Sequence, residues 1–299
     1  MPTKITYADI ILDGQRKVIK EAEVTAKKLV NDYVTSTQAL VYKYDKNIIV
    51  ARKAKEELTT LRYQFHATSY AQLQKMEGKA ITIAQMARGE GYRNYFEEFI
   101  PTFSSLDKNK QYLRMFFGGG FSDGIRNIIE AQRLKQGIDL SHSLWNYVGQ
   151  GEADVWKAVY TGLQNNQSMR QIGRTIEGYL TDTGRQNMKF NLRRLIVSET
   201  NNSYLRSQEY MTKKTPWIKK VELYRGPDGD ASCNICAEII GGVGTSKTLT
   251  VNDAEYPPYH PFCKCGYIDV LPSRQEMIKY LKSEKPLINR AKPKIKTGH

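Results

Sequence analysis

Proline is distributed very unevenly along this chain of 299 residues. Eight of its ten prolines follow residue 215, and only Pro2 and Pro101 precede it. Proline lacks a backbone N–H and blocks helix interiors, so the first two-thirds can form long helices and the last third cannot be continuously helical. The sequence therefore predicts a predominantly helical α+β protein. We expect a long helical arm at residues 1–125, a small helix-plus-strand module rich in Cys and His at 126–270, and a mobile basic tail at 271–299.

Apolar residues in the first two-thirds recur at helical spacing. The clearest stripe is formed by Ile19, Ala22, Ala26, Leu29 and Tyr33, and this period predicts an amphipathic helix. The segment 116–124 breaks the pattern with three consecutive glycines. Because glycine has a high entropic cost in regular structure, we expect a hinge or a tight loop there.

Two further helices and a strand are predicted downstream. One helix begins at Ser168, with Gln171 three residues later as its capping-box partner. The next runs from about residue 186 to 211. Alternation around Val221 and Leu223 then predicts a short strand, and Gly-Pro-Asp-Gly at 226–229 is typical of a turn.

The net charge of +14 is concentrated in two segments. Residues 185–225 contain ten Lys and Arg against three Asp and Glu, and residues 271–299 contain eight against two. Such runs can be solvated surface that keeps a protein soluble. They can also bind double-stranded DNA through its phosphates, without sequence preference. The candidate DNA-contacting residues are Arg193, Arg194, Lys213, Lys214, Lys219, Lys220, Lys282, Lys285, Arg290, Lys292, Lys294 and Lys296.

All four cysteines lie within 33 residues. Cys233 and Cys236 form a C-x-x-C pair, Cys263 and Cys265 form a C-x-C pair, and His260 stands three residues before Cys263. Two such pairs brought together offer four soft ligands for one tetrahedral zinc, with either three thiolates and an imidazole or four thiolates. Five candidate ligands for four places leave the shell open. The ligand count favours a closed structural zinc over a catalytic one.

Two other interpretations of the cysteines stay open. Free cysteine often acts as a small buried hydrophobe. A disulfide or redox pair is the other, and it is disfavoured because we expect the chain to be made in the cytoplasm. No apolar run reaches the ~20 residues of a membrane span, and the N-terminal residues show no secretory signal.

Glu199 falls on the apolar stripe of its predicted helix, where an unpaired carboxylate is costly to bury. It could be a general acid or base. No His or second carboxylate lies nearby in the sequence, so we favour a structural carboxylate bound to backbone donors or to an arginine, tying the helix to the cysteine-rich segment. We expect no catalytic residues and no small-molecule substrate.

The order of these segments resembles the Mu F-like minor head protein family of tailed bacteriophages. The matching stretches are Gln-Ser-Met-Arg-Gln-Ile at 167–172, Val-Ser-Glu-Thr-Asn at 197–201, the Trp-led strand at 217–223, the stretch from Asp to C-x-x-C at 230–236, and Pro-Pro-Tyr-His-Pro-Phe-Cys-Lys-Cys at 257–265. The second stretch departs from the family's Arg-Thr-Glu element, because Val197 and Ser198 stand at its first two positions while Glu199 is kept.

The resemblance implies a low-copy structural protein of the virion. Such a protein is assembled in the host cytoplasm, lies inside the capsid near the portal, and contacts portal and capsid proteins and packaged DNA. It would support head morphogenesis and DNA ejection. Two other function classes stay open: a zinc-dependent nuclease, for which His260 is the nearby candidate base, and a host-directed regulator that binds nucleic acid.

Overall fold

The computed structural model describes residues 6–43, 51–99, 121–135, 140–165, 167–181, 188–225 and 233–283. The described elements, in chain order, are α1 (Tyr7–Lys43), α2 (Ala51–Phe99), α4 (Phe121–Lys135), α5 (Leu140–Gln164), α6 (Met169–Thr181), α7 (Met188–Lys214), β1 (Lys220–Tyr224), α8 (Asn234–Ile239), β2 (Ser246–Thr250), β3 (Gly266–Val270) and α9 (Arg274–Ser283). The predicted α+β class with a helical majority is confirmed.

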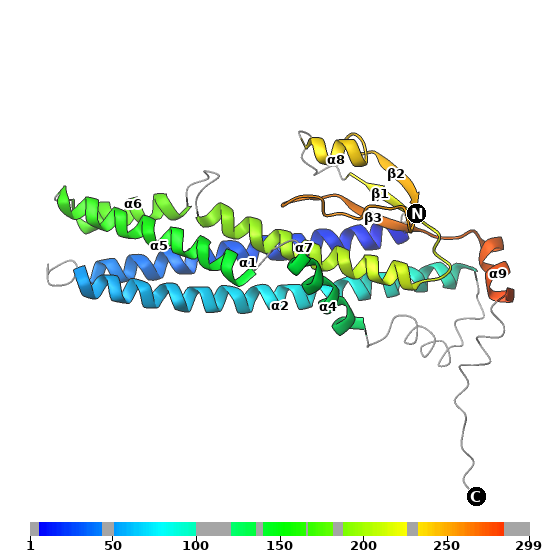
Figure 1. Cartoon of the computed structure of the whole chain (residues 1–299), viewed down its shortest axis with the longest axis horizontal. Coiled ribbons are helices and arrows are strands. Elements are labelled where there is room, and N and C mark those ends of the chain that lie inside the picture. Colours follow the sequence, from blue (N-terminus) through cyan, green and yellow to red (C-terminus); the bar gives the residue numbers. More distant parts are fainter. Residues whose placement is uncertain are drawn as a thin grey trace, which may run out of the picture.

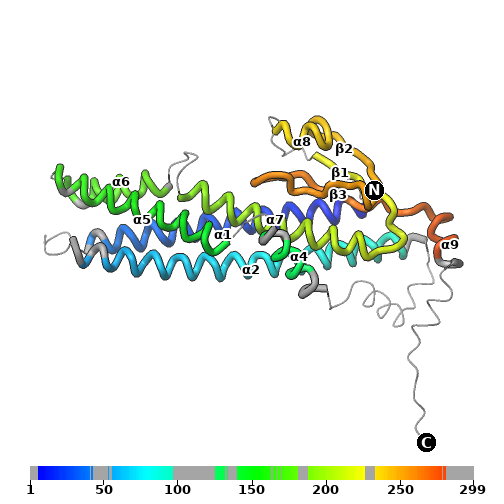
Figure 2. Tube along the Cα trace, in the orientation of Figure 1, coloured from blue at the N-terminus to red at the C-terminus, as the bar shows by residue number. Residues whose placement is uncertain are grey.

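The molecule is elongated, with the small sheet stacked on one half of a long helical bundle. Figure 1 shows α1 and α2 side by side along the long axis, with α5 and α6 over one half and the sheet and α8 over the other. The tube in Figure 2 shows α7 running beside α1 and α2 beneath the sheet. Helix α7 therefore connects the two halves.

The helical core continues across the predicted boundary at residue 125. Buried apolar residues of α1 and α2 belong to the same cluster as those of α5, α6 and α7. Ala22 and Ala26 have no exposed surface, so the predicted stripe faces this core. Residue 125 itself lies inside α4, and Ile125 packs against Ile81 of α2. The segments named as arm and module thus share one apolar interior. None of the described helices has an apolar stretch long enough to cross a membrane.

The predicted start of α6 is confirmed, and its capping box is formed. The Ser168 N–H donates to Gln171 Oε1 at 2.8 Å, and the Gln171 N–H donates to Ser168 Oγ at 3.3 Å. These bonds satisfy backbone donors that a helix leaves free at its first turn. The helix predicted from about residue 186 to 211 is also confirmed, as α7 at Met188–Lys214.

The predicted strand is confirmed as β1, the centre of a three-stranded antiparallel sheet of order β2-β1-β3. Val221 and Leu223 are fully buried, while Lys220 is exposed. Leu223 pairs with Lys247 of β2 on one side and with Tyr267 of β3 on the other. The alternation arises because one face of the sheet packs toward the bundle.

Two expectations differ from the structure. Residues 121–124 are the first turn of α4 and not part of a loop, because the helix they begin buries Ile125 and Ile129; residues 116–120 lie outside the described part. The start of the predicted mobile tail is also ordered. Residues 274–283 form α9, whose Met277 is buried in an aromatic cluster. The predicted turn at 226–229 and the rest of the tail from 284 lie outside the described residues.

Candidate metal centre

Cys233 and Cys236 face His260 across the start of α8. Cys233 is the N-cap of this helix and Cys236 stands in its first turn, so residues three apart place both thiols on one side. The His260 Nε2 atom lies 3.0 Å from Cys233 Sγ and 3.1 Å from Cys236 Sγ. His260, which stands three residues before Cys263, thus lies beside the two thiols of the C-x-x-C pair.

A tight turn at 260–263 positions the second pair. The Cys263 N–H donates to the His260 carbonyl at 3.1 Å, with Pro261 at the second turn position and Phe262 at the third. Phe262 has φ of 61°, which is the left-handed backbone that a type II turn requires and that glycine usually supplies. Its N–H donates to Ser198 Oγ of α7 at 3.0 Å, which holds the turn against the helix.

Cys263 and Cys265 are the remaining members of the cluster. Both are buried, and Cys263 Sγ lies 3.9 Å from Cys236 Sγ. The five side chains therefore form two overlapping triads that could hold a metal ion: Cys233, Cys236 and His260 in one, and Cys236, Cys263 and Cys265 in the other. Cys236 belongs to both. All four cysteines are free thiols, and 3.9 Å is far beyond a disulfide bond of about 2.05 Å.

Helices α1 and α7 fix the backbone of the cysteine pair. Asn201 Nδ2 of α7 donates to the Cys263 carbonyl at 2.9 Å. Gln15 Nε2 of α1 donates to the Cys265 carbonyl at 3.2 Å and to Asn201 Oδ1 at 3.1 Å. Both amides are buried, with 4% exposure for Gln15 and 2% for Asn201. Buried amides fully engaged in this way hold the cluster in one geometry.

The thiols differ in their protonation chemistry. A hydrogen bond from Cys265 lowers the pKa of Cys263 to about 5, and the same bond raises the pKa of Cys265. Burial raises the pKa of Cys236 to about 12. Cys263 therefore loses its proton more readily than Cys265 does.

The outer nitrogen of His260 is also engaged. Its Nδ1 lies 2.8 Å from the Pro261 carbonyl. A proton on Nδ1 donated to that carbonyl leaves the Nε2 lone pair directed at the two thiols. Histidine ligands of metals commonly have this arrangement.

Glu199 is buried and bound to an arginine, as the structural interpretation predicts. It is 8% exposed, and Arg133 of α4 donates to its Oε2 at 2.9 Å. Arg133 also pairs with Glu77 of α2. The partner is not where we expected it, because Glu199 ties α7 to α4 and α2. Its neighbours Ser198 and Asn201, on another side of the helix, are the residues that bind the cysteine-rich segment.

The candidate DNA-contacting residues of α7 and β1 have varied surroundings. Arg193 pairs with Glu23, Arg194 donates to Tyr147, and Lys213 pairs with Glu209. Lys214, Lys219 and Lys220 are exposed. The described part of the chain does not include the Lys282 side chain or the later residues Lys285, Arg290, Lys292, Lys294 and Lys296.

The sequence does not predict the supporting roles of Gln15, Ser198 and Asn201. A usable signal existed for α7, because Ser198 and Asn201 are polar residues at i, i+3 beside an apolar stripe. No such signal existed for Gln15, since 250 positions separate it from Cys265.

Comparisons of this chain with protein-family models, with curated proteins and with solved structures find no match.

Proposed function

We propose that this chain is a structural head protein of a tailed phage. It lies inside the capsid near the portal, contacts packaged DNA without sequence preference, and supports head morphogenesis and DNA ejection. In this proposal it is a virion component assembled in the host cytoplasm, it performs no catalysis, and one zinc ion closes its C-terminal module.

The observation behind the proposal is the contact between α7 and the Cys/His cluster. Two stretches that resemble the Mu F-like family, 197–201 and 257–265, are separated in the chain and touch in the fold. Ser198 and Asn201 of the first bind the backbone of Phe262 and Cys263 of the second. The two stretches therefore occur together because each stabilises the other in the fold. This role needs no chemistry on a substrate.

The donor set fits zinc as the metal. Thiolates and imidazole are the ligands of structural zinc, and two sulfurs on a tetrahedral zinc are about 3.8 Å apart. The Cys236–Cys263 separation of 3.9 Å matches this edge. The shell holds either three of the thiolates with His260 or all four thiolates, and Cys236 belongs to both triads. Zinc there would supply a cross-link between α8 and the 260–263 turn.

The basic residues support a DNA contact of the phosphate type. Lys220 begins β1 and Lys219 precedes it, and both are exposed, as are Lys213 and Lys214 at the end of α7. A cluster of flexible ammonium groups neutralises phosphates without reading base edges. Capsid and portal contacts of the chain are proposals from the family resemblance alone.

The nuclease hypothesis lacks support in the geometry. His260 was its nearby candidate base, yet Nε2 faces two thiols and Nδ1 faces a carbonyl. A base must have a free nitrogen within reach of the proton it takes. A metal-dependent nuclease assay distinguishes this hypothesis from the structural one.

The location in the virion is tested by mass spectrometry of purified particles of the encoding phage. We expect the chain in mature particles at low copy number and in complexes that co-purify with the portal protein. Its absence from particles, together with its presence in infected cells, would overturn the head-protein proposal and favour a host-directed regulator.

A further inference from the structure

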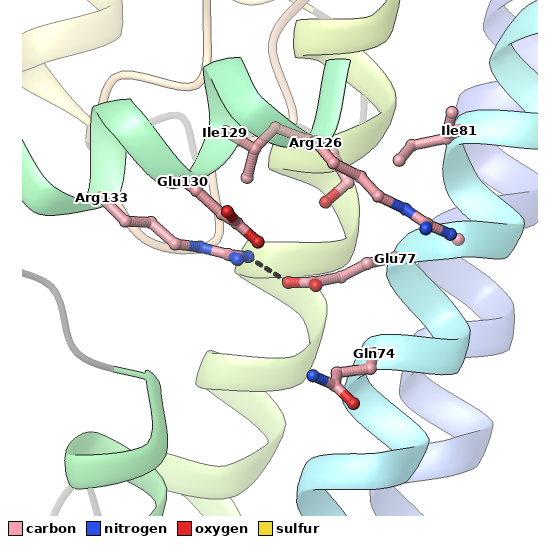
Figure 3. Close-up of a pocket in the computed structure, with 9 residues that line it drawn as sticks. Gln74, Glu77, Ile81, Arg126, Ile129, Glu130 and Arg133 are labelled. Atoms are coloured by element: carbon pink, nitrogen blue, oxygen red, sulfur yellow. Dashed lines mark hydrogen bonds and ion pairs between the residues drawn. The ribbon is translucent and has the colours of Figure 1, made fainter. Parts of the chain in front are cut away.

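A polar cavity of about 320 Å³ lies between α2, α4 and α7. Figure 3 shows Glu77 from α2 and Glu130 and Arg133 from α4 turned toward one another, while Arg126 extends toward α2. The lining also includes Gln74, Ile129 and Ser203. Ser203 is the residue of α7 that lines the cavity, whereas Ser198 and Asn201 of the same helix bind the cysteine-rich segment. The proposed function does not use the cavity.

The charges around this cavity do not balance. Arg133 lies between Glu77 and Glu199 and pairs with both. Glu130 adds a third carboxylate, while Arg126 is the second guanidinium of the lining. The lining by itself is balanced, with Glu77 and Glu130 against Arg126 and Arg133. Glu199 does not line the cavity but pairs with Arg133, and with it the group carries one negative charge in excess. Burial accordingly raises the pKa of Glu77 despite Arg133, and the charges of Glu199 and Glu130 add to this effect.

Ser203 presents a buried hydroxyl to the same space. The residue has no exposed surface, and its Oγ has no hydrogen-bond partner among the described residues. An unsatisfied buried hydroxyl costs about 1–3 kcal/mol. This hydroxyl lines a cavity that is large enough for a ligand, so the missing partner can be supplied from outside the chain.

We infer that this cavity binds a primary ammonium group carried on an aliphatic chain. The ammonium has three N–H donors and no acceptor, which suits the carboxylates of Glu77 and Glu130 and the hydroxyl of Ser203. Ile81 and Ile129 provide an apolar wall for the methylene groups. An anion would add to the negative charge that Glu199 leaves in excess in this group. The potential metal-binding groups in the described part of the chain are Cys/His clusters, and this cavity is not among them.

Two sources can supply such a group: a free diamine, or the lysine side chain of a partner protein. Titration calorimetry on the full chain distinguishes them, with putrescine as one probe and N-acetyl-lysine methylamide as the other. Both titrations are run against sodium chloride of equal ionic strength. Tighter binding of putrescine assigns the site to free diamines, and tighter binding of the lysine derivative assigns it to a protein side chain. No heat above the salt control for either probe overturns the inference.

Variants link the binding to this cavity. We expect Ser203→Ala to weaken the better probe by about tenfold, because a hydrogen bond to a charged group is lost, and to leave the melting temperature unchanged or higher. Glu130→Gln, at an exposed position, should also weaken binding. The matched control is Thr200→Val, since Thr200 is likewise buried with an unpartnered hydroxyl in the described structure but does not line the cavity. Equal affinity of Ser203→Ala and Thr200→Val would overturn the assignment of the site.

Discussion

Arg88 of α2 and Asp269 of β3, 181 positions apart in the chain, form an ion pair from which solvent is almost wholly excluded. The two side chains are 0% and 1% exposed. The remaining hydrogen-bonding capacity of the pair is used: Arg88 also donates to Thr212 Oγ1 at 2.9 Å, and Asp269 accepts from Tyr92 at 2.5 Å and from Tyr7 at 2.9 Å. The pair holds the sheet onto α1, α2 and α7, and β3 directly follows Cys265.

The first prediction concerns this pair. Asp269→Asn leaves Arg88 buried without a counter-charge, so we expect the free energy of unfolding to fall by about 3–5 kcal/mol. The matched control is the double variant Arg88→Met with Asp269→Leu, which removes both charges and should recover most of the loss. Urea unfolding followed by circular dichroism measures both. A single variant as stable as the wild type would contradict the assignment of this pair as the sheet's attachment.

The second prediction concerns the metal. We expect about one zinc per purified chain, measured by plasma mass spectrometry. Cys236→Ser should lose it, because Cys236 belongs to both triads. Cys263→Ser should lose it as well, and zinc kept in Cys265→Ser but lost in His260→Ala gives a shell of three thiolates and an imidazole. Loss of zinc in Cys265→Ser with retention in His260→Ala would instead give a shell of four thiolates.

The third prediction concerns the turn that places Cys263. Phe262→Gly and Phe262→Ala both remove the ring that packs against Phe190. Only glycine is unstrained at φ of 61°, so Phe262→Gly should be the more stable of the two by about 1 kcal/mol. Thermal unfolding of both variants with metal bound gives the comparison. Equal stability would mean that the turn relaxes when the ring is absent.

The fourth prediction concerns Glu199. Glu199→Gln keeps an acceptor for Arg133, while Glu199→Leu removes it, so the glutamine variant should be the more stable by about 1–3 kcal/mol. Hydrogen exchange should show faster opening of α4 in the leucine variant, since Arg133 attaches α4 to α7. If Glu199 were a general acid or base, both variants would melt normally and a specific reaction would be lost.

The fifth prediction concerns DNA. Binding should be indifferent to sequence, and its affinity should fall with salt at a log–log slope of about −0.9 for each phosphate neutralised. Removing residues 284–299 leaves α9 in place and deletes Lys285, Arg290, Lys292, Lys294 and Lys296. The slope of the truncated chain should become shallower. Lys219→Gln with Lys220→Gln tests the ordered part, and filter binding at several salt concentrations measures both changes. An unchanged slope in both variants would remove the DNA contact from the proposed function.

The elements of this protein are largely determined by local sequence. The capping box at Ser168 and Gln171, the buried alternation of Val221 and Leu223, and the helical stripe that includes Ala22 and Ala26 all form as predicted. Each depends on residues within one or two turns of each other, where propensity and periodicity act directly. The ligand pairs are likewise local, because Cys233 with Cys236 and His260 with Cys263 are set three residues apart.

Only the tertiary structure decided which pairs meet and what holds them. The partner of Glu199 is Arg133, 66 positions away, and the support for Cys265 comes from Gln15, 250 positions away. The composition of residues 271–283 is that of a basic tail, yet Met277 packs in an aromatic cluster at the C-terminal end of α2. A buried polar side chain signals in the sequence that it needs a partner. Which partner it finds depends on how the long helices align, and many alignments satisfy the same local pattern.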